Sequence, residues 1–153
     1  LNAAIFADLE RNGKVFRVYN VHLSSMKLDA RPVNWFDKAV YIFDQLKAGS
    51  IKRSKQVNAL IDHMKTSPYP YLVCGDFNET PYSYVYSQMR RNLTNAFEKR
   101  GQGFGFTLNQ KPYYLRIDHQ FFSKEFKLQK YTVDRSMRIS DHFPTYGYYI
   151  LPK

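Results

Sequence analysis

The sequence has little cysteine, few acidic residues and no long apolar run, and each shortage excludes a class of protein. A single cysteine, Cys74, excludes a disulfide framework within the chain and a metal site built from cysteines. No apolar run approaches the length of a membrane span, and no charged-then-apolar leader is present. The chain opens within a strand-like run and without an initiator methionine, so we expect a fragment, and any signal or anchor would lie outside it. The sequence does not indicate the cellular compartment of the protein.

Lysine and arginine outnumber the acidic residues by 23 to 13, which gives a formal net charge of +10. Such an excess favours polyanionic partners, either nucleic acid or an anionic membrane surface. A lysine-rich solvated surface would have the same composition, so charge alone does not separate these cases. Hydrophobic residues make up 44% and aromatic residues 17% of the chain, which predicts a folded core. The length of 153 residues fits one domain, residues 1–153.

The most informative stretch is a short apolar run, 71–74, that ends in Gly75 and is followed by Asp76 and Asn78. It predicts a buried strand with two oxygen-bearing side chains at its tip. Residues two apart in an extended chain point to the same face, so these side chains lie together. A carboxylate beside an amide oxygen suits a hydrated divalent cation such as Mg²⁺. Asp and Asn are also ordinary turn residues, and this motif alone leaves that alternative open.

Similar polar tips recur at other predicted strands. Residues 3–9 and 14–23 flank Asn12-Gly13, the turn sequence of a tight hairpin. Further strands are expected over 116–122, 126–133 and 145–151. Polar side chains at such places either carry function or are satisfied by hydrogen bonds in the core. The four polar tips are Asn20 with His22, Asp76 with Asn78, Asp118, and Asp141 with His142.

Apolar residues at helical spacing between 36 and 64 predict two helices, or one bent helix, whose apolar stripe packs on a sheet. Thr80-Pro81 predicts a further helix that begins there. Lys52, Arg53 and Lys55 are expected on a solvated face. The glycine-rich run 101–105 lacks a Walker lysine and a capped helix, so we expect a surface loop. Together these elements predict an α/β (α+β) fold, with a mixed, mainly antiparallel sheet and its helices on one face.

If the strands share one sheet, the polar tips can converge at a single edge. They contain the groups that metal-assisted hydrolysis of a phosphate ester requires. Carboxylate and amide oxygens can hold Mg²⁺ and a phosphate oxygen. One histidine can take a proton from water, a buried aspartate can orient that histidine, and a second histidine can stabilise the oxyanion.

The motifs Asn-x-His-Leu, Gly-Asp-Phe-Asn, Arg-Ile-Asp-His and Ser-Asp-His-x-Pro, in this order, resemble those of the endonuclease/exonuclease/phosphatase superfamily, which has the fold of deoxyribonuclease I. The resemblance implies a phosphodiesterase, nuclease or phosphatase that uses Mg²⁺ or Mn²⁺. It also implies roles for individual residues. These are His142 as general base, Asp118 to orient it, Asp76 and Asn78 on the metal and the scissile phosphate, Asp141 as a metal ligand, His22 on the phosphate oxygens with Asn20 in support, and Arg116 and Thr107 as polar support.

The chain also departs from the family pattern. Members are four-layer α/β/β/α sandwiches of roughly 250 residues or more, and their first half supplies a metal-binding Glu, usually after a Gln. No Gln-Glu pair precedes His22, and Glu79 belongs to a different motif. The chain therefore resembles the C-terminal half of such a domain, with the N-terminal half as its natural partner. We expect weak metal binding, little or no activity in isolation, and a homodimer formed through the exposed sheet face.

The substrate stays open among nucleic acid, a phospholipid headgroup and an inositol phosphate, all of which this superfamily serves. The alternative is a non-catalytic module that holds nucleic acid or an anionic surface. Interleaved Tyr and Lys in 127–131 would suit stacking on bases, but the pattern favours an ordinary edge strand.

Overall fold

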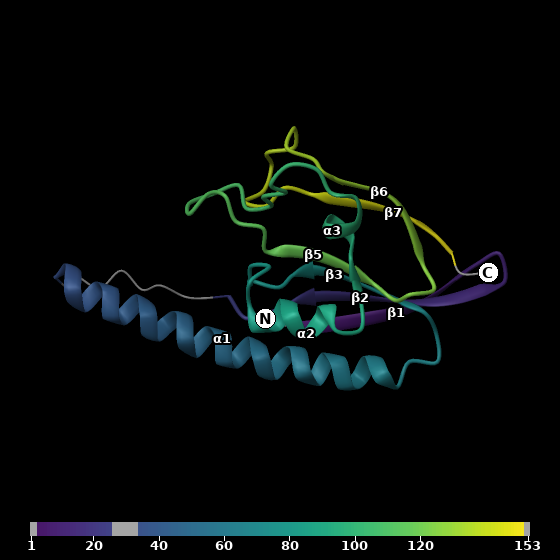
Figure 1. Cartoon of the computed structure of the whole chain (residues 1–153), viewed down its shortest axis with the longest axis horizontal. Helices are drawn as coiled ribbons and strands as arrows, with labels where there is room; N and C mark the ends of the chain where they lie inside the picture. The colour runs from purple at the N-terminus through teal and green to yellow at the C-terminus, as the bar shows by residue number, and fades with distance from the viewer. Residues whose placement is uncertain (1–2, 26–33, 152–153) are drawn as a thin grey trace.

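A five-stranded mixed sheet forms the middle layer of the protein in the computed structural model, which describes residues 3–25 and 34–151 (Figure 1). The strand order is β1-β2-β3-β5-β4. The β2–β3 pair is parallel and the other neighbouring pairs are antiparallel, which confirms the predicted sheet. The strands are β1 (Ala3–Arg11), β2 (Lys14–His22), β3 (Tyr71–Asp76), β4 (Thr94–Asn95) and β5 (Asp118–Phe122).

The predicted hairpin joins β1 to β2. Asn12 and Gly13 have φ angles of 54° and 72°, the left-handed backbone that a two-residue turn between twisted strands requires. The parallel connection from β2 to β3 instead needs a long crossover, and α1 (Trp35–Lys65) provides it.

Two helices, α1 and α2 (Tyr84–Arg90), cover one face of the sheet (Figure 1). Side chains alternate between the two faces of a strand, so every second residue of β2 and β3 points towards these helices. The side chains that fill this layer share nearly complete burial and an apolar character. They include Tyr19, Val21, Leu23, Val57, Leu60, Met64, Val73, Phe77, Val85, Tyr86, Met89 and Phe121.

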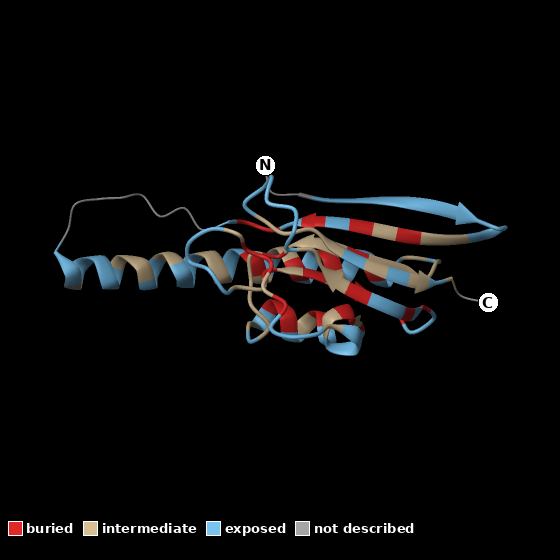
Figure 2. Cartoon of the chain, turned by 90° about the horizontal axis from the view of Figure 1, so that it is seen from above, coloured by how far each residue is buried: buried red, intermediate tan, exposed pale blue. Residues whose placement is uncertain are grey.

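The α1 helix is one unbroken element of 31 residues, and only part of its apolar stripe packs as predicted. Gly49 lies within the helix and does not interrupt it; a Cβ there would lie 2.9 Å from Nη1 of Arg53. The N-terminal half extends past the sheet and shows exposed and half-buried residues (Figures 1 and 2). Val40, Phe43 and Leu46 are exposed there, so the predicted packing is wrong for this half.

The helix predicted at Thr80-Pro81 begins three residues later. Ser83 is the residue that caps α2, because its hydroxyl accepts a hydrogen bond from the backbone N–H of Tyr86. Pro81 therefore lies in the turn that leads to the helix and not at its first position.

The last two strands do not join the main sheet as expected. Strands β6 (Lys127–Val133) and β7 (Thr145–Ile150) form a separate two-stranded sheet on the face opposite α1, together with the short helix α3 (Ala96–Arg100) (Figure 1). The face of the five-stranded sheet opposite α1 is therefore partly covered, whereas the sequence analysis predicted that this face would be exposed. The apolar side chains between the two sheets include Phe16, Leu72, Phe122, Phe126, Leu128, Tyr131 and Tyr149.

Gln120 fastens this hairpin to β5. Its Nε2 donates to the hydroxyl of Thr145 at 2.9 Å, and the hydroxyl of Tyr149 donates to its Oε1 at 2.8 Å. Because Thr145 lies directly after the loop that carries His142, this attachment also fixes the position of that loop. Part of the same face stays exposed, notably Ile5 and Leu9 on β1. No helix among residues 3–25 and 34–151 combines the length and apolar character needed to cross a bilayer.

Arg53 ties α1 to the segments that surround the end of β3. Its Nε donates to Oε1 of Glu79 at 2.7 Å, and its Nη1 donates to the carbonyl of Ser24 at 2.9 Å. Arg53 is 4% exposed, so the solvated face predicted for it is wrong. The run of basic residues Lys52, Arg53 and Lys55 predicted a solvent-exposed position for Arg53. In the structure only the two lysines are exposed.

His119 supports the same segment from the opposite side. It is 2% exposed, and its Nε2 lies 2.8 Å from the carbonyl of Glu79. A carbonyl only accepts hydrogen bonds, so Nε2 carries the proton and Nδ1 is left without one. Desolvation lowers the pKa of His119 to about 4, although the bond to Glu79 opposes this shift. The ring is therefore neutral in the folded protein.

Acidification is expected to destabilise the fold through His119. Since its pKa lies below the ordinary value of 6.5, the unfolded chain takes up the proton first. The contribution of the neutral ring is complete above the unfolded pKa and is lost as the pH falls towards about 4. The loss in free energy of unfolding is on the order of 3 kcal/mol. Urea unfolding at several pH values measures it. His119→Gln keeps a donor for Glu79 and cannot titrate, so an equal pH dependence in both proteins would contradict this explanation.

Replacement of Arg53 by methionine is expected to lower the free energy of unfolding by about 3 kcal/mol or more, because the Glu79 carboxylate stays buried without its partner. Urea unfolding checks this. Lys52→Met is the matched control at an exposed neighbour and should change stability by less than about 0.5 kcal/mol. The double variant Arg53→Met/Glu79→Leu should regain part of the loss. If the single variant and the control are equally stable, the pair does not hold this segment.

Candidate active site

Three polar residues lie side by side across the centre of the sheet. Register pairs His22 with Asp76 in neighbouring parallel strands and Asp76 with Asp118 in neighbouring antiparallel strands. His22 and Asp76 are the last residues of β2 and β3, and Asp118 is the first residue of β5. All three therefore lie at the same end of these three central strands. Their side chains share the face opposite α1, since paired residues in a sheet point the same way. The convergence predicted from the sequence is therefore present for these residues.

The turn after β3 is held by Asp76 and Asn78. The Asp76 carboxylate accepts from the backbone N–H of Asn78 at 2.8 Å and from its Nδ2 at 2.9 Å. Nδ2 also donates to the carbonyl of Leu23 at 3.0 Å. Both amide hydrogens are thereby used, and Oδ1 of Asn78 is the atom left to contact a ligand. Gly75 is required before this turn because its φ is 138° and a Cβ would collide with the carbonyl oxygen of Val21.

His142 and Asp118 form a hydrogen-bonded pair. Nδ1 of His142 lies 2.7 Å from Oδ2 of Asp118, and both side chains are largely shielded from solvent. The hydrogen bond to Asp118 raises the pKa of His142, while partial burial opposes that rise. Because Nδ1 is engaged by the carboxylate, Nε2 is the ring atom available to another molecule.

Thr107 fixes both members of this pair. Its buried hydroxyl accepts from the backbone N–H groups of Ile117 and Asp118, each at 3.1 Å. Its carbonyl accepts from the N–H of Phe143 at 2.7 Å, and the next residue, Leu108, forms a β-bridge with His142. The start of β5 and the His142 loop are thus held by one short segment.

Asp76, Asp118 and His142 could hold a metal ion. Each offers one ligand atom, and these atoms lie within 4.8 Å of one another; residues 3–25 and 34–151 contain no other such group. Burial raises the pKa of Asp76, and the neighbouring Asp118 carboxylate raises it further, whereas the Asn78 N–H, His142 and His22 lower it. A partly buried pair of carboxylates is stabilised by a cation, and oxygen ligands suit a hard divalent ion. The hydrogen bond between His142 and Asp118 engages two of these donors with each other, so Asp76, beside Oδ1 of Asn78, is the member of the group that best fits the metal that the motifs implied.

The other expected site residues differ in how close they come to this group. His22 places Nε2 at 3.7 Å from Oδ2 of Asp76, and Asn20 is exposed on the same face of β2. The Asp141 carboxylate lies outside the group of three; it is exposed and accepts hydrogen bonds from Gln110 and Ser140. Its charge nevertheless acts on His142 and contributes to the raised pKa there.

Arg116 is not brought into the group. Its guanidinium carbon lies 3.8 Å from the centre of the Phe97 ring. Burial lowers the pKa of Arg116, and the charges of Tyr86, Tyr131 and Glu98 oppose that shift. The side chain therefore packs behind the site, beside α3, and its place there does not support direct contact with a substrate.

Sequence reasoning missed the Arg53–Glu79 pair and the role of His119. The signal for both was the position of Glu79, an acidic residue directly after the Asp76–Asn78 turn with no apparent partner in the sequence. A buried acid of this kind needs a cation or donors from elsewhere in the chain. Nothing in the local sequence identifies residues 26 and 40 positions away as those partners.

The chain matches the model of the Endonuclease/Exonuclease/phosphatase family over residues 16–142. No curated protein sequence matches it. Several solved structures share its fold, at sequence identities too low to show more than the fold. A mannosyl-6-phosphatase from Bacteroides thetaiotaomicron aligns with a TM-score of 0.67 at 21% identity and covers 98% of this chain and 57% of its own.

Two further solved structures align over the same share of this chain. The human Nocturnin catalytic domain, with a bound sulfate anion, aligns with a TM-score of 0.67 at 19% identity, covering 98% of this chain and 53% of that one. An endonuclease/exonuclease/phosphatase from Bacteroides vulgatus aligns with a TM-score of 0.74 at 19% identity, covering 98% and 56%. The chain thus spans about half the length of these solved structures. The matched segment, 16–142, takes in most of the sequence and all of the paired site residues, and the protein therefore belongs to the Endonuclease/Exonuclease/phosphatase family.

Proposed function

We propose that the protein is a metal-dependent hydrolase of phosphate esters in which His142 activates the attacking water. The observation that carries this proposal is the 2.7 Å contact between His142 and Asp118 beside the Asp76 carboxylate. A histidine oriented by a carboxylate, next to an oxygen-ligand site, is the combination that metal-assisted hydrolysis uses. Family membership supports the same reaction class.

Asp118 keeps the proton of His142 on Nδ1, so Nε2 can accept a proton from water as the water oxygen attacks phosphorus. The P–O bond to the ester oxygen then breaks, and the leaving alkoxide takes up a proton from solvent. The raised pKa of His142 makes the ring a stronger base for this transfer. Asp76 and Oδ1 of Asn78 would hold the metal, with Asp141 as a further ligand from the neighbouring loop. A bound Mg²⁺ or Mn²⁺ would supply Lewis-acid stabilisation of the negative charge on the phosphate. His22, with Asn20 beside it, would contact a phosphate oxygen.

The chain alone would form an incomplete site. It spans about half of the solved family structures and lacks the Gln-Glu pair expected ahead of His22. Ile5 and Leu9 leave apolar side chains exposed on the face of the sheet that carries the site. We expect the N-terminal half of the domain to cover it. In the isolated chain, a second copy would take that place.

Light scattering of the isolated chain at micromolar concentration is expected to report a dimer, because a contiguous apolar surface of this kind favours self-association. Leu9→Lys places a charge on the exposed face of β1 and should shift the chain towards monomer. The control Glu10→Gln changes the net charge by the same amount, +1, on the opposite face of that strand. A monomer with low binding of a hydrophobic dye would contradict the dimer.

Replacement of His142 by alanine is expected to reduce hydrolysis of a chromogenic phosphodiester by roughly a hundredfold or more, since the proton acceptor is lost. Because the isolated chain would be incomplete, the measurement is the initial rate of the domain completed by its N-terminal half, in the presence of Mg²⁺, with circular dichroism to show that the fold is kept. Asp76→Asn should also reduce the rate, but through weaker Mn²⁺ binding measured by calorimetry. Asp62→Asn, at an exposed carboxylate on α1, is the control. Full activity in a folded His142 variant would exclude the proposed role.

A non-catalytic binding module is the second candidate, and the basic charge of +10 is the observation in its favour. Binding of a polyanion does not require the contact between His142 and Asp118, nor a carboxylate pair beside it. The presence of the His142–Asp118 hydrogen bond beside the Asp76 carboxylate therefore favours the hydrolase.

A further inference from the structure

Four aromatic side chains form a continuous surface on the segment that precedes Asp118 in the chain: Phe104, Phe106, Tyr113 and Tyr114. Ring centres lie 5.3 Å apart between Phe104 and Phe106, 5.4 Å between Phe106 and Tyr114, and 6.3 Å between Tyr113 and Tyr114. Phe104 is 78% and Tyr114 73% exposed. A cluster of exposed aromatic side chains on a protein surface often marks a binding site. We call this surface the aromatic platform.

The platform is built onto the segment that holds the site. Phe106 directly precedes Thr107, whose hydroxyl fixes Asp118. The carbonyl of Leu115, next to Tyr114, accepts from the N–H groups of Thr107 and Leu108. Tyr114 has a φ of 74°, a backbone conformation that a bulky residue adopts only where its surroundings hold it. The rings are therefore held in a defined arrangement at the border of the site.

Cations accompany these rings. The Arg135 guanidinium carbon lies 5.7 Å from the centre of the Phe106 ring, a cation–π distance. Lys111 precedes the two tyrosines, and Arg138 lies in the loop before Asp141; both are exposed. These residues belong to two segments, 104–116 and 134–142, which are linked by the β-bridge between Leu108 and His142. The surface thus combines flat π faces with positive charge.

We propose that the aromatic platform binds the bases of a single-stranded nucleic acid and presents its backbone phosphate to the site. The proposal rests on the proposed function and names its substrate class. Bases stack on aromatic faces without regard to sequence, and neighbouring cations hold the phosphates. A small phosphorylated sugar offers no flat face for these rings.

A membrane surface is the competing partner for exposed aromatic and basic residues. Membrane anchors present separate apolar tips that enter the lipid, whereas here the rings pack against one another. Phe104 and Phe106 are stacked at an interplanar angle of 3°, and Arg135 lies over Phe106. A packed row of rings with a cation on it offers faces, which suits stacking better than insertion.

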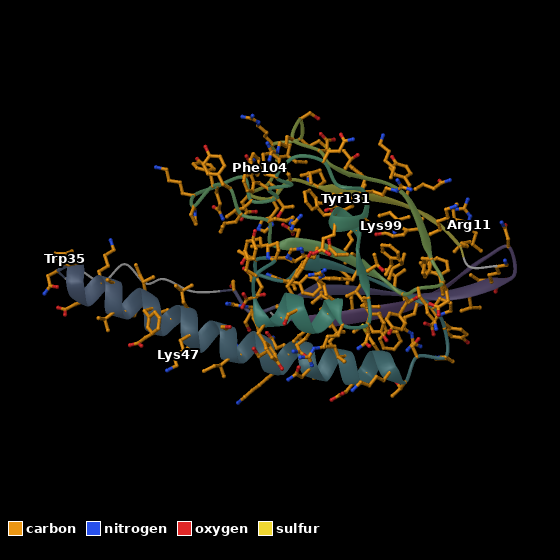
Figure 3. All side chains as sticks on the ribbon, viewed as in Figure 1. Arg11, Trp35, Lys47, Lys99, Phe104 and Tyr131 are labelled. Atoms are coloured by element: carbon orange, nitrogen blue, oxygen red, sulfur yellow. The ribbon has the colours of Figure 1, made fainter. Side chains whose placement is uncertain are left out.

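The test is fluorescence anisotropy of the intact protein with a short labelled oligothymidylate in EDTA, so that binding is measured without hydrolysis. The variant Phe104→Ala/Tyr114→Ala is expected to weaken binding by roughly tenfold or more. Arg135→Glu should weaken binding and reduce its dependence on salt. The matched controls are Phe43→Ala and Lys47→Glu on α1, away from the platform, and Figure 3 shows Lys47 and Phe104 on opposite sides of the sheet. Both controls should bind as the wild type does.

Equal oligothymidylate affinity in the platform variant and in the wild type would overturn the proposal. So would a result in which the same substitutions abolish binding to phosphatidylserine vesicles and leave oligothymidylate binding unchanged, because the platform would then face a membrane. Hydrolysis of a small chromogenic phosphodiester separates this test from the proposed function. In the domain completed by its N-terminal half, the platform variant should keep that activity, whereas His142→Ala should lose it and still bind the oligonucleotide.

Discussion

The pairing of β3 with β2 on one side and with β5 on the other is the constraint on which the site depends. Because β2 and β3 run parallel, their carboxyl ends reach the same edge and bring His22 beside Asp76. Because β5 runs antiparallel to β3, it begins where β3 ends and brings Asp118 to the other side. A shift of one residue in either pairing would move a side chain to the opposite face. The long crossover helix α1 serves this geometry, since only such a connection permits the parallel pair.

That arrangement concentrates negative charge in a partly buried place, and the surrounding structure compensates for it. The hydrogen bond from His142 and the two donors of Asn78 satisfy the carboxylates of Asp118 and Asp76. Burial nevertheless raises the pKa of Asp76, which indicates that a cation would further stabilise its charged form. Behind the turn, Arg53 and His119 both bind Glu79, one through its carboxylate and the other through its carbonyl. The segment after the turn is therefore fixed within the chain itself, through both the side chain and the backbone carbonyl of Glu79.

The sequence allowed the main sheet, the β1–β2 hairpin and the convergence of Asp76, Asp118 and His142 to be predicted, because these features follow from local patterns. Alternating side chains and the Asn12-Gly13 turn are visible within a few residues. Sequence analysis failed where distant packing decides the outcome. Arg53 looks like its exposed lysine neighbours until Glu79 is placed against it, and the stripe of Val40 and Phe43 looks like core although α1 extends past the sheet there.

The separate β6–β7 sheet could not be predicted for the same reason. Its strands have ordinary alternating patterns, and those patterns do not say which sheet a strand will join. The choice is made by Gln120, a polar residue within β5 that binds Thr145 and Tyr149 of the hairpin. Such a contact links segments about 25 residues apart and leaves no mark on either one alone.

Asp118 and His119 show how a strand gives neighbouring residues opposite environments. The Arg-Ile-Asp-His motif places a histidine directly after the carboxylate, yet these two side chains point to opposite faces of β5. His119 enters the apolar layer beneath α2, where burial lowers its pKa to about 4 and keeps the ring neutral. His142, from a loop about 24 residues away, reaches Asp118 instead, and the hydrogen bond between them raises its pKa. His119 is next to Asp118 in the sequence and His142 is next to it in space, and their pKa values shift in opposite directions because one ring is buried and the other is hydrogen-bonded to the carboxylate.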